Sequence, residues 1–313
     1  IKVRITVEWE KKQAKKTFNF LAGALMIYNL IFGFVVFGID LMEISTLLFI
    51  FDDMQWDQAA EIVYHSGIGL SIGSVVGVII VGLIMQQSPS FEKRRLIDVN
   101  TIIIFYILMQ AIQLLGNYIL LPMEFLVYWA GYSFEEATTA ASQVSDLFSS
   151  FIYSVAVAPI AEEILCRGIV MKKLEKYGKS FAVLISAMLF GLLHQNIVQF
   201  PITMMIGILF GYLAQKYSLK AAILLHVLNN VSVEMVGILG ERYAIVWTLD
   251  ILFLHFCVVA SVVILWKKRD VIKEFCKRQE QKNPALKWFF TTPFMLFTIV
   301  YFLFLTIKSI TPF

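Results

Sequence analysis

Long apolar runs restrict most strongly what this chain can fold into. Several windows of about 20 apolar residues are long enough to cross a hydrocarbon core of about 30 Å as helices. Composition agrees, because 59% of the 313 residues are hydrophobic, 16% are charged and the mean hydropathy is +0.76, values that exclude an ordinary soluble domain. We therefore expect an all-α, polytopic membrane helical bundle of about eight or nine transmembrane helices. The predicted segments are residues 18–39, 66–86, 100–121, 147–171, 180–198, 201–215, 220–238, 244–266 and 288–307.

Basic residues are concentrated in alternate loops between these segments. The N-terminal tail and the second, fourth, sixth and eighth loops hold 23 of the 26 Lys and Arg residues, whereas the first and third loops are acidic. Because cytoplasmic loops carry the excess of Lys and Arg, this pattern predicts a cytoplasmic N-terminus. After an odd number of spans, the C-terminus is then expected outside. The basic loop 267–287 lies between Trp266 and Trp288, an arrangement typical of anchoring at an anionic inner leaflet rather than of nucleic-acid binding.

These features predict a multi-pass protein of the cell membrane. The Lys-, Phe- and Ile-rich composition suits a low-GC bacterium, so the bacterial plasma membrane is the expected location. Nothing ahead of the first long helix resembles a removable signal peptide. The three cysteines, Cys166, Cys257 and Cys276, form no motif, which argues against a disulfide framework.

Glycines at a spacing of four predict close helix contacts. Gly69, Gly73 and Gly77 fall in the second segment, and Gly207 and Gly211 in the sixth. Small residues at this spacing allow helix backbones to approach closely in lipid. The contacts can lie within one chain or between two, and the second alternative gives a homo-oligomer through Gly69, Gly73 and Gly77.

Ionisable and amide side chains occur where apolar helices should carry none. Three motifs follow one another along the chain: Glu162-Glu163-x-x-x-Arg167, Phe190-x-x-x-His194 and His226-x-x-x-Asn230. A charged side chain near the bilayer centre costs a few kcal/mol on insertion scales, so it marks a functional site by default. Two carboxylates, two imidazoles and a carboxamide are also the groups that activation of water for hydrolysis requires.

The three motifs are predicted to meet at one depth of the membrane. A helix rise of about 1.5 Å per residue, counted from the nearest cytoplasmic lysine, puts His226 about 9 Å deep, Glu162 and Asn230 about 15 Å deep, and His194 about 22 Å deep. All four positions lie between the cytoplasmic edge and the middle of the bilayer. Polar groups from three helices at compatible depth are what a buried site requires.

The helical spacing separates the two adjacent glutamates. Glu163 and Arg167 are four residues apart on one helix face and can form a salt bridge. Glu162 is turned away by about 100°, so the two carboxylates cannot serve one partner without distortion of the helix. The neutralised Glu163 then leaves Glu162 free for chemistry. Pro159, just upstream, is expected to kink this helix and open its wall to water.

A purely structural interpretation exists for each motif taken alone. Membrane helices pair Glu with Arg, and His with Asn, simply to hold helices together. Three such motifs on successive helices favour a site over three independent contacts.

In this order and spacing, the motifs resemble the CAAX protease and bacteriocin-processing (CPBP, or Abi) family, which is related to the Rce1-type CAAX prenyl endopeptidases. The resemblance covers residues 147–238, which we expect to form the protease core. An N-terminal three-helix membrane region with a cytoplasmic tail, residues 1–146, precedes it, and a two-helix extension, residues 239–313, follows it.

The resemblance implies a role for each motif residue. Glu162 corresponds to the general base that activates a water nucleophile, and His194 to its partner in polarising that water. Glu163 and Arg167 correspond to a pair that holds the helix in shape, and Phe190 to a supporting residue. His226 and Asn230 correspond to a pair that stabilises the oxyanion. The implied activity is that of an intramembrane protease.

The residue types agree with hydrolysis but do not decide whether a metal ion takes part. The chain has no Ser-His-Asp order, no Gly-x-Ser-x-Gly elbow and no His-Glu-x-x-His zinc helix. Asn and His side chains can stabilise an oxyanion in a water-poor cavity. We favour a mechanism without a metal cofactor. The alternative is zinc, held by Glu162, His194 and His226.

Substrate and partner expectations follow from this function. The leading hypothesis is an endopeptidase that cuts a peptide bond at the cytoplasmic side of the membrane. A pheromone or bacteriocin precursor is favoured as substrate over a CAAX-like protein, with the lipid bilayer as the surrounding partner and no nucleic acid. One alternative is a non-catalytic membrane regulator or bacteriocin-immunity protein on the same fold. Another is a transporter, but the chain shows no inverted repeat typical of that class.

Overall fold

The computed structural model describes residues 2–89, 95–142, 144, 147–270, 273 and 283–313. The described chain is nearly all helical. Its long helices are α1 (Lys2–Ile50), α3 (Ile68–Met85), α4 (Val99–Trp129), α9 (Lys179–Leu193), α10 (Gln199–Lys216), α11 (Leu219–Arg242), α12 (Ile245–Lys267) and α15 (Pro293–Lys308). Shorter elements are α2 (Trp56–Tyr64), α5 (Glu135–Ser142), α6 (Phe148–Ile152), η1 (Tyr153–Val157), α7 (Ala158–Glu163), η2 (Ile164–Met171), α8 (Lys172–Leu174), η3 (Glu175–Tyr177) and α14 (Pro284–Phe290). Two short antiparallel strands, β1 (Tyr132–Ser133) and β2 (Thr311–Pro312), complete the structure.

Judged by length and composition, fewer helices can span a membrane than the eight or nine predicted. Among the described residues, five helices are long and apolar enough to cross a membrane: α1, α3, α4, α11 and α12. Helices α14 and α15 add a sixth span if this pair, bent by 68°, counts as one. Helix α9 has only 15 residues, a length of about 22 Å that does not reach across the hydrocarbon core. Residues 148–174 form a run of short helical pieces rather than one regular helix.

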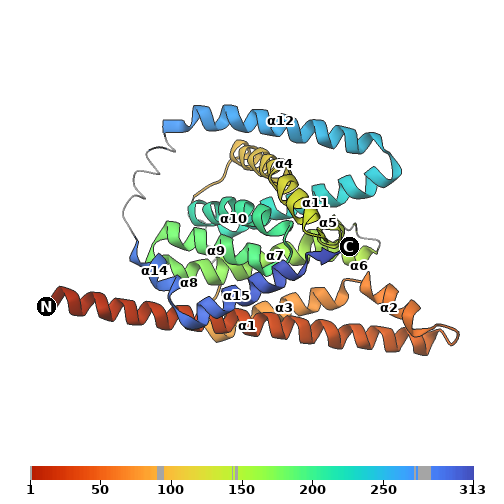
Figure 1. The fold of residues 1–313 in the computed structure, drawn as a ribbon, viewed down its shortest axis with the longest axis horizontal. Coiled ribbons are helices and arrows are strands. Elements are labelled where there is room, and N and C mark those ends of the chain that lie inside the picture. The colour runs from red at the N-terminus through yellow and green to blue at the C-terminus, as the bar shows by residue number, and fades with distance from the viewer. Residues whose placement is uncertain (1, 90–94, 143, 145–146, 271–272, 274–282) are drawn as a thin grey trace.

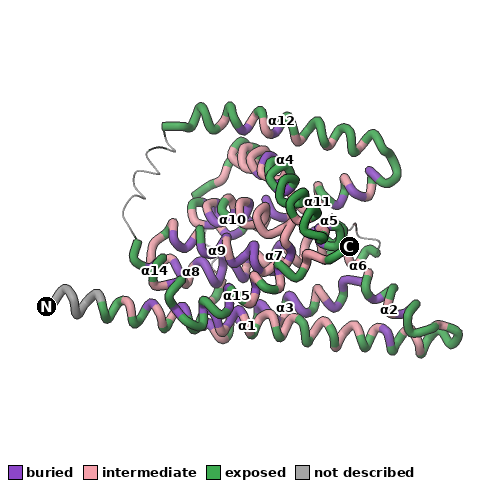
Figure 2. The backbone as a smooth tube through the Cα atoms, viewed as in Figure 1, coloured by how far each residue is buried: buried purple, intermediate pink, exposed green. Residues whose placement is uncertain are grey.

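The motif-bearing helices lie at the centre of the molecule. Helices α1 and α12 run along opposite edges, and α7 to α11 lie between them (Figure 1). Buried residues are concentrated in this central group, whereas α12 is mostly exposed (Figure 2). Large apolar side chains are exposed on the outer helices, as at Phe34 (78%) and Leu83 (72%). Lipid would cover such side chains in a membrane.

Hydrogen bonds join the loops that were predicted to share one side of the membrane. Lys176 donates to Thr17, Asn283 donates to the Tyr177 carbonyl, Lys172 donates to the Ser88 carbonyl, and the Arg95 N–H donates to the Tyr217 carbonyl. At the other end of the bundle, Asn196 donates to the Ala137 carbonyl and the Ile197 N–H donates to Ser309. These bonds join members of each predicted loop set, and the alternation of all loops across nine spans stays a prediction. Lys93, Arg94, Lys277, Arg278 and Lys282 lie outside the described residues, and the assignment of the basic end to the cytoplasm stays a prediction.

Helix α1 of the same chain covers the glycine face of α3. A Cβ at Gly77 would lie 2.8 Å from the Tyr28 ring, and one at Gly73 would lie 3.0 Å from Val36. A Cβ at Gly69 would collide with the Asp40 carboxylate. These glycines therefore serve the intrachain contact, which was one of the two alternatives left by their spacing. A homo-oligomer through them stays a prediction.

Candidate active site

The two adjacent glutamates lie on a helix that is interrupted by π-helical turns on both sides. Helix α7 ends at Glu163, with the π-helical segments η1 before it and η2 after it. Such turns are rare and frequently occur at functional sites, because one extra residue per turn rotates the side chains that follow. The distortion that would allow both glutamates to contact one partner is therefore present.

Pro159 and Asn230 explain how η1 is stabilised. In the π-helical register, the Ala158 N–H bonds to the Tyr153 carbonyl. The next donor in that register would be residue 159, but proline has no N–H, so the Ser154 carbonyl receives no bond from it. The Asn230 side chain fills the gap and donates to that carbonyl at 2.9 Å. Asn230 thus fixes the helix that carries the glutamates, and its predicted contact with an oxyanion stays a prediction.

Asn230→Leu, which has nearly the same shape, is expected to lower the free energy of unfolding by about 1–3 kcal/mol, because it leaves the Ser154 carbonyl without its partner. Unfolding of the purified protein in detergent would measure this loss. Ser232→Ala, two residues further along α11, provides the control. A normal stability of Asn230→Leu would contradict the assigned role.

Glu163 and Arg167 form a fully buried ion pair, as the spacing predicted. An Arg167 Nη1–H donates to Glu163 Oε1 at 2.7 Å, and an Nη2–H donates to the Gly207 carbonyl at 2.9 Å. A Cβ at Gly207 would lie 3.0 Å from the guanidinium, so glycine permits this approach of α10. Glu163 Oε2 and Arg167 Nε have no hydrogen-bond partner among the described residues.

Two aromatic rings enclose this pair. The Arg167 guanidinium lies over the Phe190 ring, 4.4 Å from its centroid, and 5.5 Å from that of Phe210. Phe210 also stacks on the His226 imidazole at 4.7 Å. Phe190 therefore contacts the buried pair, and its supporting role stays a prediction. Phe210 was not found from the sequence, because a single Phe within an apolar helix carries no distinguishing signal.

His226 contacts both glutamates. Its Nδ1 lies 3.2 Å from Glu163 Oε1, and its Nε2 lies 3.7 Å from Glu162 Oε2. The two carboxylates were expected not to serve one partner, and this expectation is wrong for His226, because each ring nitrogen reaches a different carboxylate. His226 links the buried pair to the more exposed Glu162.

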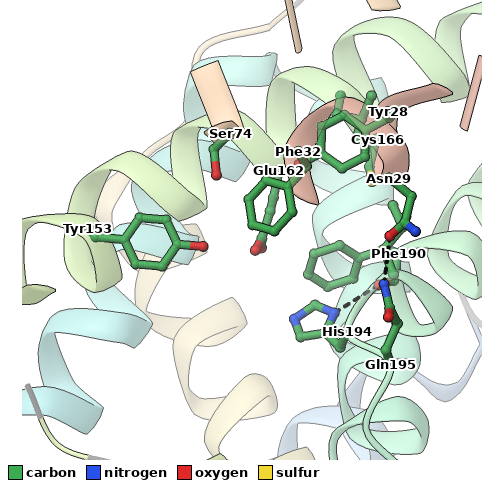
Figure 3. Close-up of a pocket in the computed structure, with 12 residues that line it drawn as sticks. Tyr28, Asn29, Phe32, Ser74, Tyr153, Glu162, Cys166, Phe190, His194 and Gln195 are labelled. Atoms are coloured by element: carbon green, nitrogen blue, oxygen red, sulfur yellow. Dashed lines mark hydrogen bonds between the residues drawn. The ribbon is translucent and has the colours of Figure 1, made fainter. Parts of the chain in front are cut away.

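Glu162 and His194 line one cavity of about 230 Å3. The Glu162 side chain is 30% exposed, whereas that of Glu163 is fully buried. Figure 3 shows the Glu162 carboxylate and the His194 ring facing the same space from two different helices. His194 Nδ1 lies 2.9 Å from the Phe190 carbonyl. Because a carbonyl only accepts, Nδ1 carries a proton there, and Nε2 is left for the cavity.

The first half of the chain supplies much of the remaining wall. Helix α1 contributes Tyr28, Asn29 and Phe32, and α3 contributes Ser74. These residues lie 88 to 134 positions before Glu162, and no sequence pattern connected them to the site. Cys166 is 1% exposed and also lines the cavity.

The zinc alternative names Glu162, His194 and His226 as ligands. Among the described residues, no group of three His, Cys, Asp or Glu side chains is placed to hold a metal ion. His226 Nδ1 faces Glu163 and His194 Nδ1 faces a carbonyl, so Nε2 is the nitrogen left on each imidazole. The choice between the metal-free mechanism and zinc stays a prediction.

Comparison with known families confirms the resemblance over the motif region. Residues 144–232 match the family described as Type II CAAX prenyl endopeptidase Rce1-like. All three motifs fall inside this segment. No curated protein and no solved structure matched the chain.

Proposed function

From the Rce1-like domain at residues 144–232, we propose that this chain is an intramembrane endopeptidase in which Glu162 and His194 activate the water that cleaves a peptide bond. The contrast between the two adjacent glutamates is the observation that carries the proposal. Glu163 is buried and paired with Arg167, whereas Glu162 opens into the cavity opposite His194. One carboxylate thus has a structural partner, and the other faces the space where a substrate can enter.

The reaction needs one proton acceptor and one group to orient the water. In the proposed mechanism, a water molecule bound between Glu162 and His194 Nε2 loses a proton to the Glu162 carboxylate. The resulting hydroxide attacks the carbonyl carbon of the substrate to form a tetrahedral intermediate. The C–N bond then breaks, and the proton held by Glu162 passes to the leaving amine. The products are a new carboxylic acid and a new amine, and transfer of the acid proton to the amine gives a carboxylate and an ammonium, so atoms and charge balance.

His226 is placed to respond to charge at Glu162. With Nε2 at 3.7 Å from Glu162 Oε2, a protonated His226 would hold the carboxylate in position and place positive charge beside the developing oxyanion. Its other nitrogen is fixed by Glu163 at 3.2 Å, and Glu163 is fixed in turn by Arg167. The buried pair therefore supports the orientation of the groups that face the substrate.

The cavity lies among helices that are apolar enough to enter a bilayer, which supports a membrane-embedded site in a multi-pass protein. We assign the basic end of the molecule to the cytoplasm from its loop charges. The proposed substrate is a peptide precursor of the pheromone or bacteriocin type. A CAAX-like protein is the second substrate class.

Two peptide classes and a chelator test the proposal together. Purified protein in detergent is incubated with a bacterial precursor peptide or with a prenylated CAAX peptide, each with and without a zinc chelator. We expect cleavage of the precursor at one internal bond, at a rate that changes less than about twofold with chelator, because the site offers no three-residue ligand set. Chelator-sensitive cleavage would contradict the metal-free mechanism. Preference for the prenylated peptide would contradict the substrate assignment.

A further inference from the structure

The residue after His194 has an unusual backbone conformation. Gln195 has φ +51°, in the left-handed region that a side chain with a Cβ rarely adopts. Its N–H bonds to the Leu192 carbonyl at 3.1 Å, and this bond closes the C-terminus of α9. Glycine is the usual residue at this position of a helix end. Contacts outside the helix can therefore restrain Gln195 in this conformation.

A chain of hydrogen bonds provides that restraint. Gln195 Nε2–H donates to Asn29 Oδ1 at 2.8 Å, and Asn29 Nδ2–H donates to the Tyr301 hydroxyl at 3.2 Å. Figure 3 shows Gln195 and Asn29 joined beside His194 on the cavity wall. Asn29 belongs to α1 and Tyr301 to α15, so both lie outside the segment that matches the protease family.

The turn beyond Gln195 is anchored separately. Asn196 Oδ1 accepts from the Val198 and Gln199 N–H groups, and Asn196 Nδ2–H donates to the Ala137 carbonyl at 2.8 Å. Gln195 is therefore the hinge between this fixed turn and His194, and its backbone conformation sets the direction in which α9 ends.

We propose that Asn29 and Tyr301 are positioning residues that hold Gln195 in the left-handed conformation and thereby aim His194 Nε2 at the cavity. The outer helices α1 and α15 thus complete an active site whose reacting groups lie in the central helices. The inference rests on the proposed role of His194 in activating water.

The variant Gln195→Gly distinguishes a positioning role of the tether from direct contact between the Gln195 side chain and the substrate. Asn29→Leu keeps the shape of the side chain but removes its hydrogen bond to Gln195. We expect kcat to fall about tenfold to a hundredfold with KM unchanged, because a small displacement of a reacting group has such effects. Gln195→Gly is expected to keep kcat within about threefold of wild type, because glycine adopts positive φ without a tether. The same change should restore kcat in the Asn29→Leu protein. Tyr301→Phe, which spares the Gln195–Asn29 bond, should show a smaller loss than Asn29→Leu.

Asn19→Leu is the matched control. Asn19 also connects α1 to α15, since its Oδ1 accepts from the Phe294 N–H at 3.3 Å, and it does not line the cavity. This variant should retain wild-type kcat. The proposal is overturned if Asn29→Leu has normal kcat, or if Gln195→Gly loses as much activity as Asn29→Leu, which would mean that the Gln195 side chain itself contacts the substrate.

The imidazole signals provide a readout that needs no substrate. The chain has four histidines, so NMR of histidine-labelled full-length protein can follow each ring. Asn29→Leu should shift or broaden the His194 signal, Gln195→Gly in that protein should restore it, and the His255 signal should stay in place. An unchanged His194 signal in Asn29→Leu would refute the proposal even if no cleaved substrate were known. A shifted His194 signal without any peptide cleavage would instead support the positioning and leave the proteolytic function contradicted.

Discussion

Replacing Glu162 with glutamine is expected to lower kcat for peptide cleavage by at least about a thousandfold, near the detection limit. Glutamine keeps the size and much of the hydrogen bonding of the side chain but cannot take a proton from water. Catalysis by a general base alone contributes about 10²–10⁴-fold. The initial rate of product formation by the purified variant measures the effect.

Two other carboxylates serve as controls for Glu162→Gln. Glu241, at the exposed end of α11, should tolerate the same change with wild-type activity. Glu163→Gln should lose both stability and activity, because Glu163 supports Arg167 and His226 rather than the substrate. Glu162→Gln, in contrast, should unfold at the same temperature as wild type. Full activity in Glu162→Gln would contradict the assignment of the base.

The largest loss of stability is expected for Arg167→Leu. Without Arg167, the Glu163 carboxylate stays fully buried. Among the described residues, only His226 then remains as its side-chain partner. Removal of one partner from a buried ion pair destabilises a protein by about 3–5 kcal/mol. Loss of the contacts to the Phe190 and Phe210 rings adds to this effect. Unfolding of the purified variant in detergent measures the change.

A double variant that removes both Glu163 and Arg167 distinguishes the cost of an unpaired buried charge from the cost of lost packing. In Glu163→Leu/Arg167→Leu no buried charge is left alone, so the double variant should be more stable than Arg167→Leu. Arg242→Leu, at the exposed C-terminus of α11, should change stability by less than about 0.5 kcal/mol. Equal losses in the single and double variants would show that packing, rather than charge, dominates at this site.

Local spacing predicted some of the contacts among the motif residues. The four-residue interval between Glu163 and Arg167 predicted their ion pair, and the common depth of the three motifs predicted that Glu162, His194 and His226 would lie close together. These inferences use helix geometry, which a sequence specifies directly. The nearly all-helical fold followed in the same way from the apolar segments.

Contacts between distant segments could not be predicted. Nothing in the local sequence connects Asn29 or Tyr301 with Gln195, because their meeting depends on how α1 and α15 pack against α9. The π-helical turns were also missed, since the apolar pattern of residues 148–171 is as compatible with a regular helix. The number of spans differs because α9 is short and the helix around α7 is divided, and a hydropathy window does not detect either feature.

Mass spectrometry of a precursor peptide after incubation with the protein in lipid nanodiscs tests the central claim most directly. The proposed function predicts two complementary products from one internal bond with wild type, and none with Glu162→Gln. Folding of both proteins is checked by their unfolding temperatures. Absence of cleavage by folded wild type across the precursor and prenylated peptides, or equal cleavage by both proteins, would contradict a protease that depends on Glu162.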